Sequence, residues 1–219
     1  MTRVSASLLG ADQMRLGEEI ARAEAAGVSW LHIDNMDGHF VPNISFGPDF
    51  VRAVRGTTKL FLDVHLMLEH PLAYIDRFAD AGSDMITVHV EAADDPETTL
   101  RAIAARGLKA GLSISPETPP EAVAPYLSLC DLVLVMTVKP GLGGQKIRED
   151  CVDKLRALRR MADESGREIL LSVDGGVKAN NAIREVSAGA DVLVMGTGIF
   201  GAEDPRAVVE TIRGLPCAR

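Results

Sequence analysis

The chain has 219 residues and a formal net charge of −8, and 47% of its residues are hydrophobic although only 4% are aromatic. This length fits one large domain or two small ones, and the apolar fraction is sufficient for a sizeable aliphatic core. The acidic balance, without a basic stripe, argues against nucleic-acid binding, and no apolar run is long enough to span a membrane.

Eight short apolar runs are predicted to form strands, at residues 4–7, 30–34, 60–65, 85–89, 109–114, 132–136, 169–173 and 192–195. Segments with helical periodicity separate them, for example residues 12–26, 72–81 and 147–165. Five helical segments are predicted to end in a glycine, because glycine readily adopts the left-handed conformation that ends a helix. These are Gly27, Gly82, Gly107, Gly166 and Gly189.

Apolar strands that alternate with helices predict a parallel sheet covered on its outer face. An open doubly wound sheet and a closed (β/α)8 barrel both fit this alternation. Eight repeats within this length favour the barrel, and no GxGxxG motif follows the first strand. Because no linker or shift in composition marks a boundary, we predict a single (β/α)8 TIM barrel domain over residues 1–219.

Polar residues at the carboxyl ends of strands are typical of catalytic sites in such barrels. His32 and Asp34 end the second predicted strand, and their two-residue spacing places them on one face. Asp63 and His65 end the third strand with the same spacing, and Asp174 directly follows the seventh. Each residue alone is more commonly structural. Two imidazoles and two carboxylates at one rim nevertheless form a plausible site for Zn²⁺, Fe²⁺ or Mn²⁺.

Other residues near strand ends have less specific interpretations. His89 ends the fourth strand, and we expect it to support the site or the fold rather than to bind a ligand. Asp37 and His39 follow the second strand and are expected to shape that loop. Three methionines lie at strand ends, where they either fill gaps in the core or line a water-poor cavity. These are Met36, Met67 and Met136.

Three glycine clusters follow the last three strands, where barrels commonly bind phosphate. Glycine allows backbone N–H groups to approach an anion, and a helix N-terminus adds a favourable dipole. The alternative is that these glycines only form tight turns. The clusters contain Gly141, Gly143 and Gly144, then Gly175 and Gly176, and finally Gly196 with Thr197.

Residues 31–43, with the sequence LHIDNMDGHFVPN, closely resemble the signature of the ribulose-phosphate 3-epimerase family. Further similar motifs are DVHLM at 63–67, MTVKPG at 136–141, GGQ at 143–145 and VDGGV at 173–177. The resemblance covers nearly the whole chain. It departs from the family at four positions. Ala6 replaces a usual Pro, Asn35 a usual Val or Ile, and Leu142 and Ile147 a common Phe.

The resemblance implies a metal-dependent epimerase that interconverts D-ribulose 5-phosphate and D-xylulose 5-phosphate in the pentose phosphate pathway. Asp34 and Asp174 would be the catalytic acid and base. One divalent metal ion per chain (Zn, Fe(II), Mn or Co) would be bound by His32, Asp34, His65 and Asp174. The substrate would contact Ser7, His32, His65, Met36, Met67, Met136, Gly141, Leu142, Gly143, Gly144, Gly175, Gly176, Gly196 and Thr197.

Three other functions compete with this interpretation. A 3-epimerase for a related ketose phosphate, such as allulose 6-phosphate, would use the same chemistry and the same motifs. A phosphate-binding barrel lyase or decarboxylase usually has a catalytic Lys near strand two, and no Lys ends the second or third predicted strand here. A protein that only binds sugar phosphates would not need the paired carboxylates Asp34 and Asp174.

The cysteines and the N-terminus bear on the cellular location. Cys130, Cys151 and Cys217 are scattered and share no CxxC spacing, which indicates reduced thiols rather than a disulfide framework. The first residues read as a strand and lack the apolar segment of a signal peptide. We therefore expect a cytoplasmic protein whose partners are small sugar phosphates and further copies of the chain, as a homo-oligomer.

Overall fold

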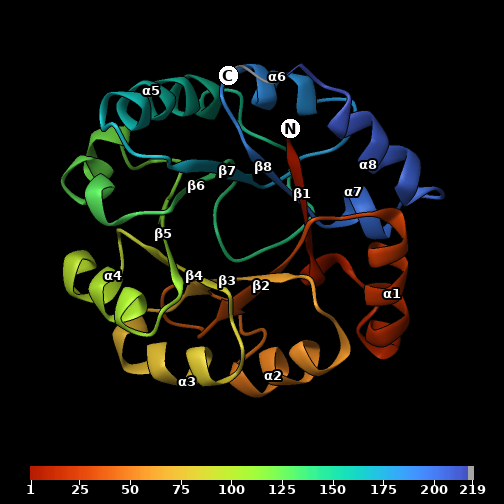
Figure 1. Ribbon diagram of the computed structural model, residues 1–219, viewed down its shortest axis with the longest axis horizontal. Coiled ribbons are helices and arrows are strands. Elements are labelled where there is room, and N and C mark those ends of the chain that lie inside the picture. Colours follow the sequence, from red (N-terminus) through yellow and green to blue (C-terminus); the bar gives the residue numbers. More distant parts are fainter. Residues whose placement is uncertain (217–219) are drawn as a thin grey trace.

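The computed structural model describes residues 1–216 and contains eight parallel strands that close into a barrel (Figure 1). Each strand pairs with the next one in the chain, and the last pairs with the first, which confirms the predicted (β/α)8 barrel. The strands are β1 (Arg3–Ser7), β2 (Trp30–Met36), β3 (Phe61–Met67), β4 (Met85–His89), β5 (Lys109–Ile114), β6 (Leu132–Met136), β7 (Leu170–Asp174) and β8 (Val192–Met195).

Helices form a ring outside the strands and bury the outer face of the barrel (Figure 1). The α-helices are α1 (Leu16–Ala26), α2 (Pro48–Thr57), α3 (Ile75–Asp80), α4 (Pro96–Ala105), α5 (Cys151–Glu164), α6 (Ala182–Ser187), α7 (Thr197–Phe200) and α8 (Pro205–Arg213). Short 3₁₀ helices are η1 (Leu8–Gly10), η2 (Gln13–Arg15), η3 (Pro71–Tyr74) and η4 (Pro120–Leu129). Fully buried side chains such as Leu155 and Leu158 of α5 show how each helix turns an apolar stripe inward.

The structure moves several predicted boundaries. β2 and β3 each run two residues further than expected, because Asn35 and Met36 continue to pair with Leu66 and Met67. The helix predicted to start at residue 147 begins at Cys151, and the segment before it forms part of the loop after β6. The helix predicted over 12–26 begins with the separate turn η2, and the predicted helix 72–81 includes η3.

The predicted helix-ending glycines are confirmed. All five have a positive φ, between 69° and 112°. Gly27, for example, follows α1 with φ 86°, and its N–H donates to the carbonyl oxygens of Ala23 and Glu24. A residue with a side chain would be strained in this conformation, which explains why glycine occurs at each of these helix ends.

The barrel interior is apolar at one end and polar at the other. Trp30, Met85, Leu132 and Val192 are inward-facing and buried near the amino ends of their strands, and they form one hydrophobic cluster. The inward-facing residues two or four positions later along several strands are Ser, Asp, Thr or His. Since all eight strands are parallel, these polar side chains gather at the carboxyl end of the barrel.

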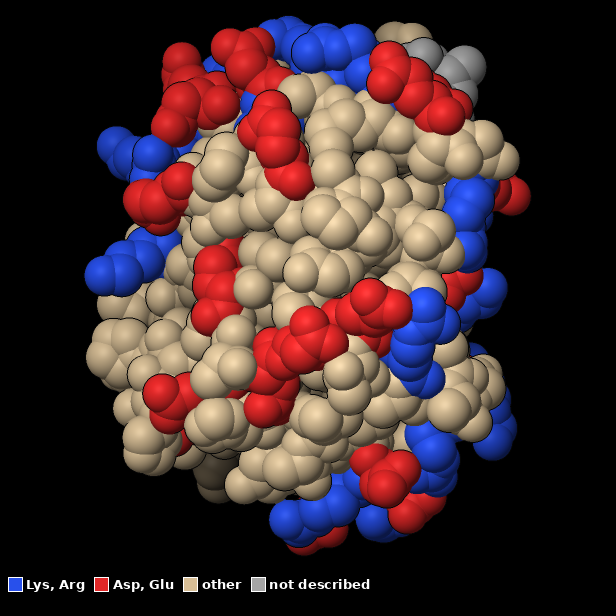
Figure 2. All heavy atoms as spheres, turned by 90° about the vertical axis from the view of Figure 1, so that its left-hand side faces the viewer, with Lys and Arg blue, Asp and Glu red and all other residues tan. Residues whose placement is uncertain are grey.

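The cysteines, the hydropathy of the helices and the distribution of surface charge can be located in the structure. Cys130 and Cys151 are buried free thiols, and Cys217 lies outside the described residues. Within residues 1–216, no helix has both the length and the hydropathy needed to cross a membrane. On the face that Figure 2 shows, acidic side chains run across the middle while Lys and Arg stay near the edges, so this face offers no basic stripe.

Candidate active site

The pairing of β2 with β3 brings three of the predicted metal ligands into contact. The register places Asp34 beside His65, and His32 lies two residues before Asp34 on the same face. Nε2 of His32 and Nδ1 of His65 each lie 3.1 Å from Oδ1 of Asp34. Ser7 of β1 donates its hydroxyl to Oδ2 of the same carboxylate at 2.9 Å.

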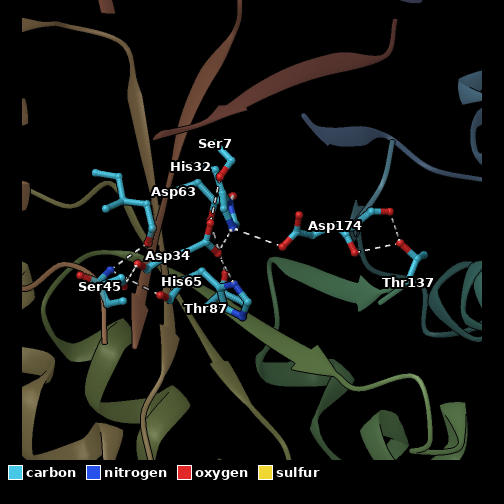
Figure 3. Close-up of polar contacts among 12 residues, drawn as sticks. Ser7, His32, Asp34, Ser45, Asp63, His65, Thr87, Thr137 and Asp174 are labelled. Atoms are coloured by element: carbon cyan, nitrogen blue, oxygen red, sulfur yellow. Dashed lines mark hydrogen bonds and ion pairs between the residues drawn. The ribbon is translucent and has the colours of Figure 1, made fainter. Parts of the chain in front are cut away.

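Asp174 reaches this group from β7, on the opposite side of the barrel (Figure 3). Its Oδ2 lies 3.9 Å from Nε2 of His32. The hydroxyl of Thr137 donates to the backbone carbonyls of Asp174 and Gly175, at 2.9 and 2.6 Å, and so fixes the end of β7. The structure therefore brings together all four residues predicted from the sequence as metal ligands.

These four residues fit a divalent metal ion. One ligand atom from each of His32, Asp34, His65 and Asp174 lies within 4.8 Å of the others. The second ring nitrogen of His32 lies 2.8 Å from Oδ2 of Asp63, and a carboxylate behind a histidine is the usual support of a metal-binding imidazole. Two imidazole nitrogens and two carboxylate oxygens suit Zn²⁺, Fe²⁺, Mn²⁺ or Co²⁺.

The environment separates the two aspartates electrostatically. Burial and the nearby charge of Asp34 raise the pKa of Asp174 to about 7. Burial would also raise the pKa of Asp34, but the charge of His32 and its hydrogen bond to Asp34 hold that pKa well below its usual range. Burial would lower the pKa of His32, but the carboxylates of Asp34 and Asp63 outweigh it and raise that pKa well above its usual value.

A cavity of about 780 Å³ opens above the four residues. Asp174 keeps 17% of its side-chain exposure and Asp34 keeps 5%, so both carboxylates border the cavity. His32 and His65 are fully buried and lie behind the carboxylates rather than in the lining of the cavity, and their direct contact with substrate stays a prediction. The other predicted substrate-binding residues all line the cavity: Ser7, Met36, Met67, Met136, Gly141, Leu142, Gly143, Gly144, Gly175, Gly176, Gly196 and Thr197.

The three glycine clusters form one wall of this cavity. Gly176 has φ +68°, and a Cβ atom at this position would lie 2.5 Å from the backbone nitrogen of Ile147. The side chain of Asn181 donates to the carbonyl of Gly176 at 3.0 Å. Thr197 begins α7, and the first N–H groups of a helix have no partners within it. This wall therefore offers glycine turns and a helix N-terminus to an anion.

The loop between β6 and α5 crosses the centre of the barrel in Figure 1 and covers part of the cavity. The side chain of Asn43, in the loop after β2, donates to the carbonyl of Gly141 at 2.8 Å. Asp37 accepts hydrogen bonds from the N–H groups of His39, Phe40 and Glu69 at 2.8 to 2.9 Å, which confirms that it shapes the loop after β2.

Sequence reasoning missed several residues of this site. Lys139, Lys146 and Lys178 line the cavity and give an acidic protein local positive charge. They lie in the glycine-rich loops, but charged residues in loops are too common to be singled out from sequence. Asp63 was recognised as inward-facing, but its contact with His32 depends on the strand register, which the sequence does not reveal.

Comparison with known proteins places the chain among close relatives. The model of the ribulose-phosphate 3 epimerase family matches residues 3–200. The ribulose-phosphate 3-epimerase of Bacillus subtilis is 46% identical over 215 residues, covering 98% of this chain and 99% of that protein. The ribulose-phosphate 3-epimerase of a Synechocystis species is 45% identical over 212 residues, covering 96% of this chain and 92% of that protein.

Solved structures with lower sequence identity share the fold. The 3-hexulose-6-phosphate synthase of Salmonella typhimurium superimposes with a TM-score of 0.69 at 18% identity, covering 96% of both chains. KGPDC from Streptococcus mutans gives a TM-score of 0.71 at 13% identity, with 97% of this chain and 96% of that chain covered. At such low identities the likeness establishes the barrel architecture alone.

Proposed function

The chain belongs to the ribulose-phosphate 3-epimerase family, and we propose that it interconverts D-ribulose 5-phosphate and D-xylulose 5-phosphate with Asp34 and Asp174 as the two proton-transferring groups. The observation that carries this proposal is the placement of the two carboxylates. They enter one cavity from β2 and β7, on opposite sides of the barrel (Figure 3).

Inversion at C3 requires the removal of a proton from one face of the carbon and the delivery of a proton to the other face. A carboxylate on each side of the substrate meets this requirement, since one acts as the base while the other acts as the acid. Their surroundings make the two carboxyl groups unequal, since the pKa of Asp34 is held below its usual range while burial and the charge of Asp34 raise that of Asp174 to about 7. In the reverse reaction the two residues exchange roles.

The residues around the two carboxylates bind and orient the substrate. When bound, a divalent cation would act as a Lewis acid that favours negative charge on the oxygens next to C3. His32 and His65 would hold this cation together with both aspartates. Ser7 donates to Oδ2 of Asp34 and so fixes the direction of its carboxylate. Met36, Met67 and Met136 line the cavity near the aspartates and would exclude water from the reacting carbon.

The glycine wall and the three cavity lysines would hold the phosphate group. This distal contact would place C3 between the two carboxylates, which converts binding energy into orientation. Charged hydrogen bonds from backbone N–H groups suit a phosphate dianion, and the lysines add long-range attraction. The substrate class is therefore a ketose that carries a phosphate at the end remote from the reacting carbon.

Gly176→Ala tests this phosphate site. The added Cβ would collide with the backbone of Gln145 and Ile147, so we expect the wall to open and KM to rise about tenfold or more, as for the loss of one charged hydrogen bond. Gly107→Ala is the matched control, because Gly107 also has a positive φ of 73° but has open space around it after α4. Steady-state kinetics on both folded variants decides the matter, and an unchanged KM for Gly176→Ala would place the phosphate elsewhere.

Metal affinity should depend on pH through Asp174. Because the pKa of Asp174 is raised to about 7, its carboxyl is protonated below that pH and must lose the proton to bind a cation. His32 must also lose a proton, because its pKa is raised well above the usual value. We expect the apparent Kd for Zn²⁺ to rise as the pH falls, and to rise by about a further tenfold per pH unit below pH 7, where Asp174 is protonated. Competition with a chromophoric chelator measures this slope. Metal binding to Asp174→Asn should release about one proton fewer, so log Kd should change less steeply with pH in that variant. An equally steep slope would contradict the role of Asp174 as a titrating metal ligand.

A direct assay decides between the candidate substrates. We expect faster C3 deuterium exchange and faster epimerisation for ribulose 5-phosphate than for allulose 6-phosphate, since relatives that match nearly all of this chain are named ribulose-phosphate 3-epimerases. A higher kcat/KM for the six-carbon substrate would reverse the order. The similarity to 3-hexulose-6-phosphate synthase and KGPDC is limited to the fold, so a lyase or decarboxylase activity is not proposed.

Three further expectations complete the proposal. We propose that residues 1–219 act as one catalytic domain in the cytoplasm and that the chain forms a homo-oligomer. Exposed hydrophobic side chains outside the cavity offer contact points for a second copy, with Met14 at 91% and Ile44 at 77% relative exposure. Sedimentation analysis of the protein would measure the oligomeric state.

A further inference from the structure

A buried hydrogen-bond series leads away from the metal site. It consists of His65, His89 at the end of β4, and Glu91 in the loop after β4. Nε2 of His65 lies 2.9 Å from Nε2 of His89, and the two rings stack with centroids 5.0 Å apart. Nδ1 of His89 lies 3.0 Å from Oε2 of Glu91. Both histidines are at most 1% exposed, so water does not compete for these contacts.

Glu91, at the end of the hydrogen-bond series remote from the metal site, is fixed by its own hydrogen bonds. Oε1 of Glu91 accepts a hydrogen bond from the N–H of Ser115 at 2.7 Å and another from the hydroxyl of Thr118. Burial would raise the pKa of Glu91, but hydrogen bonds from His89, Thr118 and Ser115 lower it to about 2. Lys154 of α5 fixes the same loop, since its Nζ donates to the backbone carbonyls of Ser115 and Pro116 at 2.8 and 2.7 Å. Glu91 is therefore an ionised acceptor with a fixed orientation.

The contacts that link Asp34, His65, His89 and Glu91 outnumber the ring protons of the two histidines. Asp34–His65, His65–His89 and His89–Glu91 are three contacts, and each needs one proton to be a hydrogen bond. Two neutral imidazoles carry only two ring protons, and burial disfavours an additional positive charge. One of the three contacts must therefore lack a proton.

The surroundings determine which contact lacks the proton. Asp34 has other donors, because Ser7 donates to Oδ2 and His32 lies 3.1 Å from Oδ1. For Oε2 of Glu91, His89 is the one side-chain donor that the structure gives among residues 1–216. The proton of His89 therefore belongs on Nδ1 and that of His65 on Nε2. The bare Nδ1 of His65 then faces Oδ1 of Asp34 at 3.1 Å, and these two lone pairs are oriented to bind one cation.

We propose that His89 and Glu91 are positioning residues, which hold His65 in the tautomer that presents Nδ1 as a metal ligand. This inference rests on the proposed metal site and adds two residues that do not touch the metal. It assigns a function to Glu91, which lies two residues after β4. It also makes specific the supporting role that the sequence predicts for His89. Supporting hydrogen bonds of this kind typically change metal affinity by about 10- to 100-fold when they are lost.

Glu91→Gln tests which ring nitrogens of His89 and His65 carry the protons. The carbonyl oxygen of the introduced glutamine would keep the hydrogen bonds from Ser115 and Thr118, so its NH₂ group would face His89. His89 would then have to accept at Nδ1 and carry its proton on Nε2, which opposes the proton on Nε2 of His65. We expect the apparent Kd for Zn²⁺ to rise about 10- to 100-fold. The control is Glu121→Gln, which removes the same charge from an exposed position on η4.

Nitrogen-15 NMR of the metal-free protein supplies a readout that a purely structural role would not change. The chain has five histidines, so the ring signals can be assigned by single substitutions. We expect His89 to be protonated on Nδ1 in the wild type and on Nε2 in Glu91→Gln. A wild-type His89 protonated on Nε2, or a Zn²⁺ affinity of Glu91→Gln equal to that of Glu121→Gln, would overturn the inference.

Substitutions of His89 provide an independent arm. His89→Gln can accept from His65 through its carbonyl and donate to Glu91 through its amide, so it should keep Zn²⁺ affinity near the wild-type value. His89→Leu has similar bulk but no polar atoms, and it should show the full loss. Equal affinities in the two variants would also overturn the inference. A wild type that binds no stoichiometric Zn²⁺ would instead reject the proposed metal site, and this is measured before any variant is compared.

Discussion

Asp174→Asn is expected to lower kcat for epimerisation by about 10²–10⁴-fold in both directions, the usual contribution of positioned proton transfer. Asparagine keeps the size of the side chain but neither accepts nor donates a proton as a carboxyl group does. Asp34→Asn should give a similar loss from the opposite side of the cavity. The effect appears in both directions because each aspartate is the base for one epimer and the acid for the other.

Metal content has to be measured on the same samples, because both aspartates are also proposed metal ligands. The control is Asp49→Asn, an exposed substitution on α2 that should leave kcat unchanged. Steady-state rates on samples with matched metal content then separate lost proton transfer from lost metal. Near wild-type kcat in metal-loaded Asp174→Asn would show that this carboxyl does not transfer the proton.

Removal of the divalent metal with a chelator should lower kcat by about 10³-fold or more, which corresponds to about 4 kcal/mol of lost transition-state stabilisation. The reason is that the C3 proton is only weakly acidic without a nearby cation. Addition of stoichiometric Zn²⁺, Mn²⁺, Co²⁺ or Fe²⁺ should restore the rate, and the most effective ion identifies the metal preference. His32→Ala should abolish this restoration, since His32 lies at the centre of the four-residue cluster. A metal-free protein with full activity would reject the metal site.

The fold could be predicted from the sequence because its signals are local. The apolar strands, the helical periodicity and the glycines after helices each reflect short-range physical chemistry, and all eight strands occur where they were expected. The segment between β5 and β6 was less predictable. It forms the 3₁₀ helix η4, with Pro125 inside it and Pro120 at its start, and proline disrupts the hydrogen-bond pattern of an α-helix.

The site was predictable where it depends on the two-residue period of a strand. That period places His32 with Asp34 on one face of β2, and the structure confirms their contact. Contacts between strands depend on register, which is why the partnership of Asp63 with His32 could not be predicted. The contact of Glu91 with Ser115 joins two loops and was likewise beyond local sequence reasoning.

The central claim is that two carboxylates act on opposite faces of C3, and proton exchange in D₂O tests it most directly. In metal-loaded Asp34→Asn or Asp174→Asn, the remaining carboxylate can remove and return a proton on its own face alone. We therefore predict that each variant exchanges the C3 proton of one epimer with D₂O, without inversion, and that the two variants act on opposite epimers. A metal-loaded variant that inverts C3 at a near wild-type rate, with deuterium incorporated, would contradict the two-carboxylate mechanism.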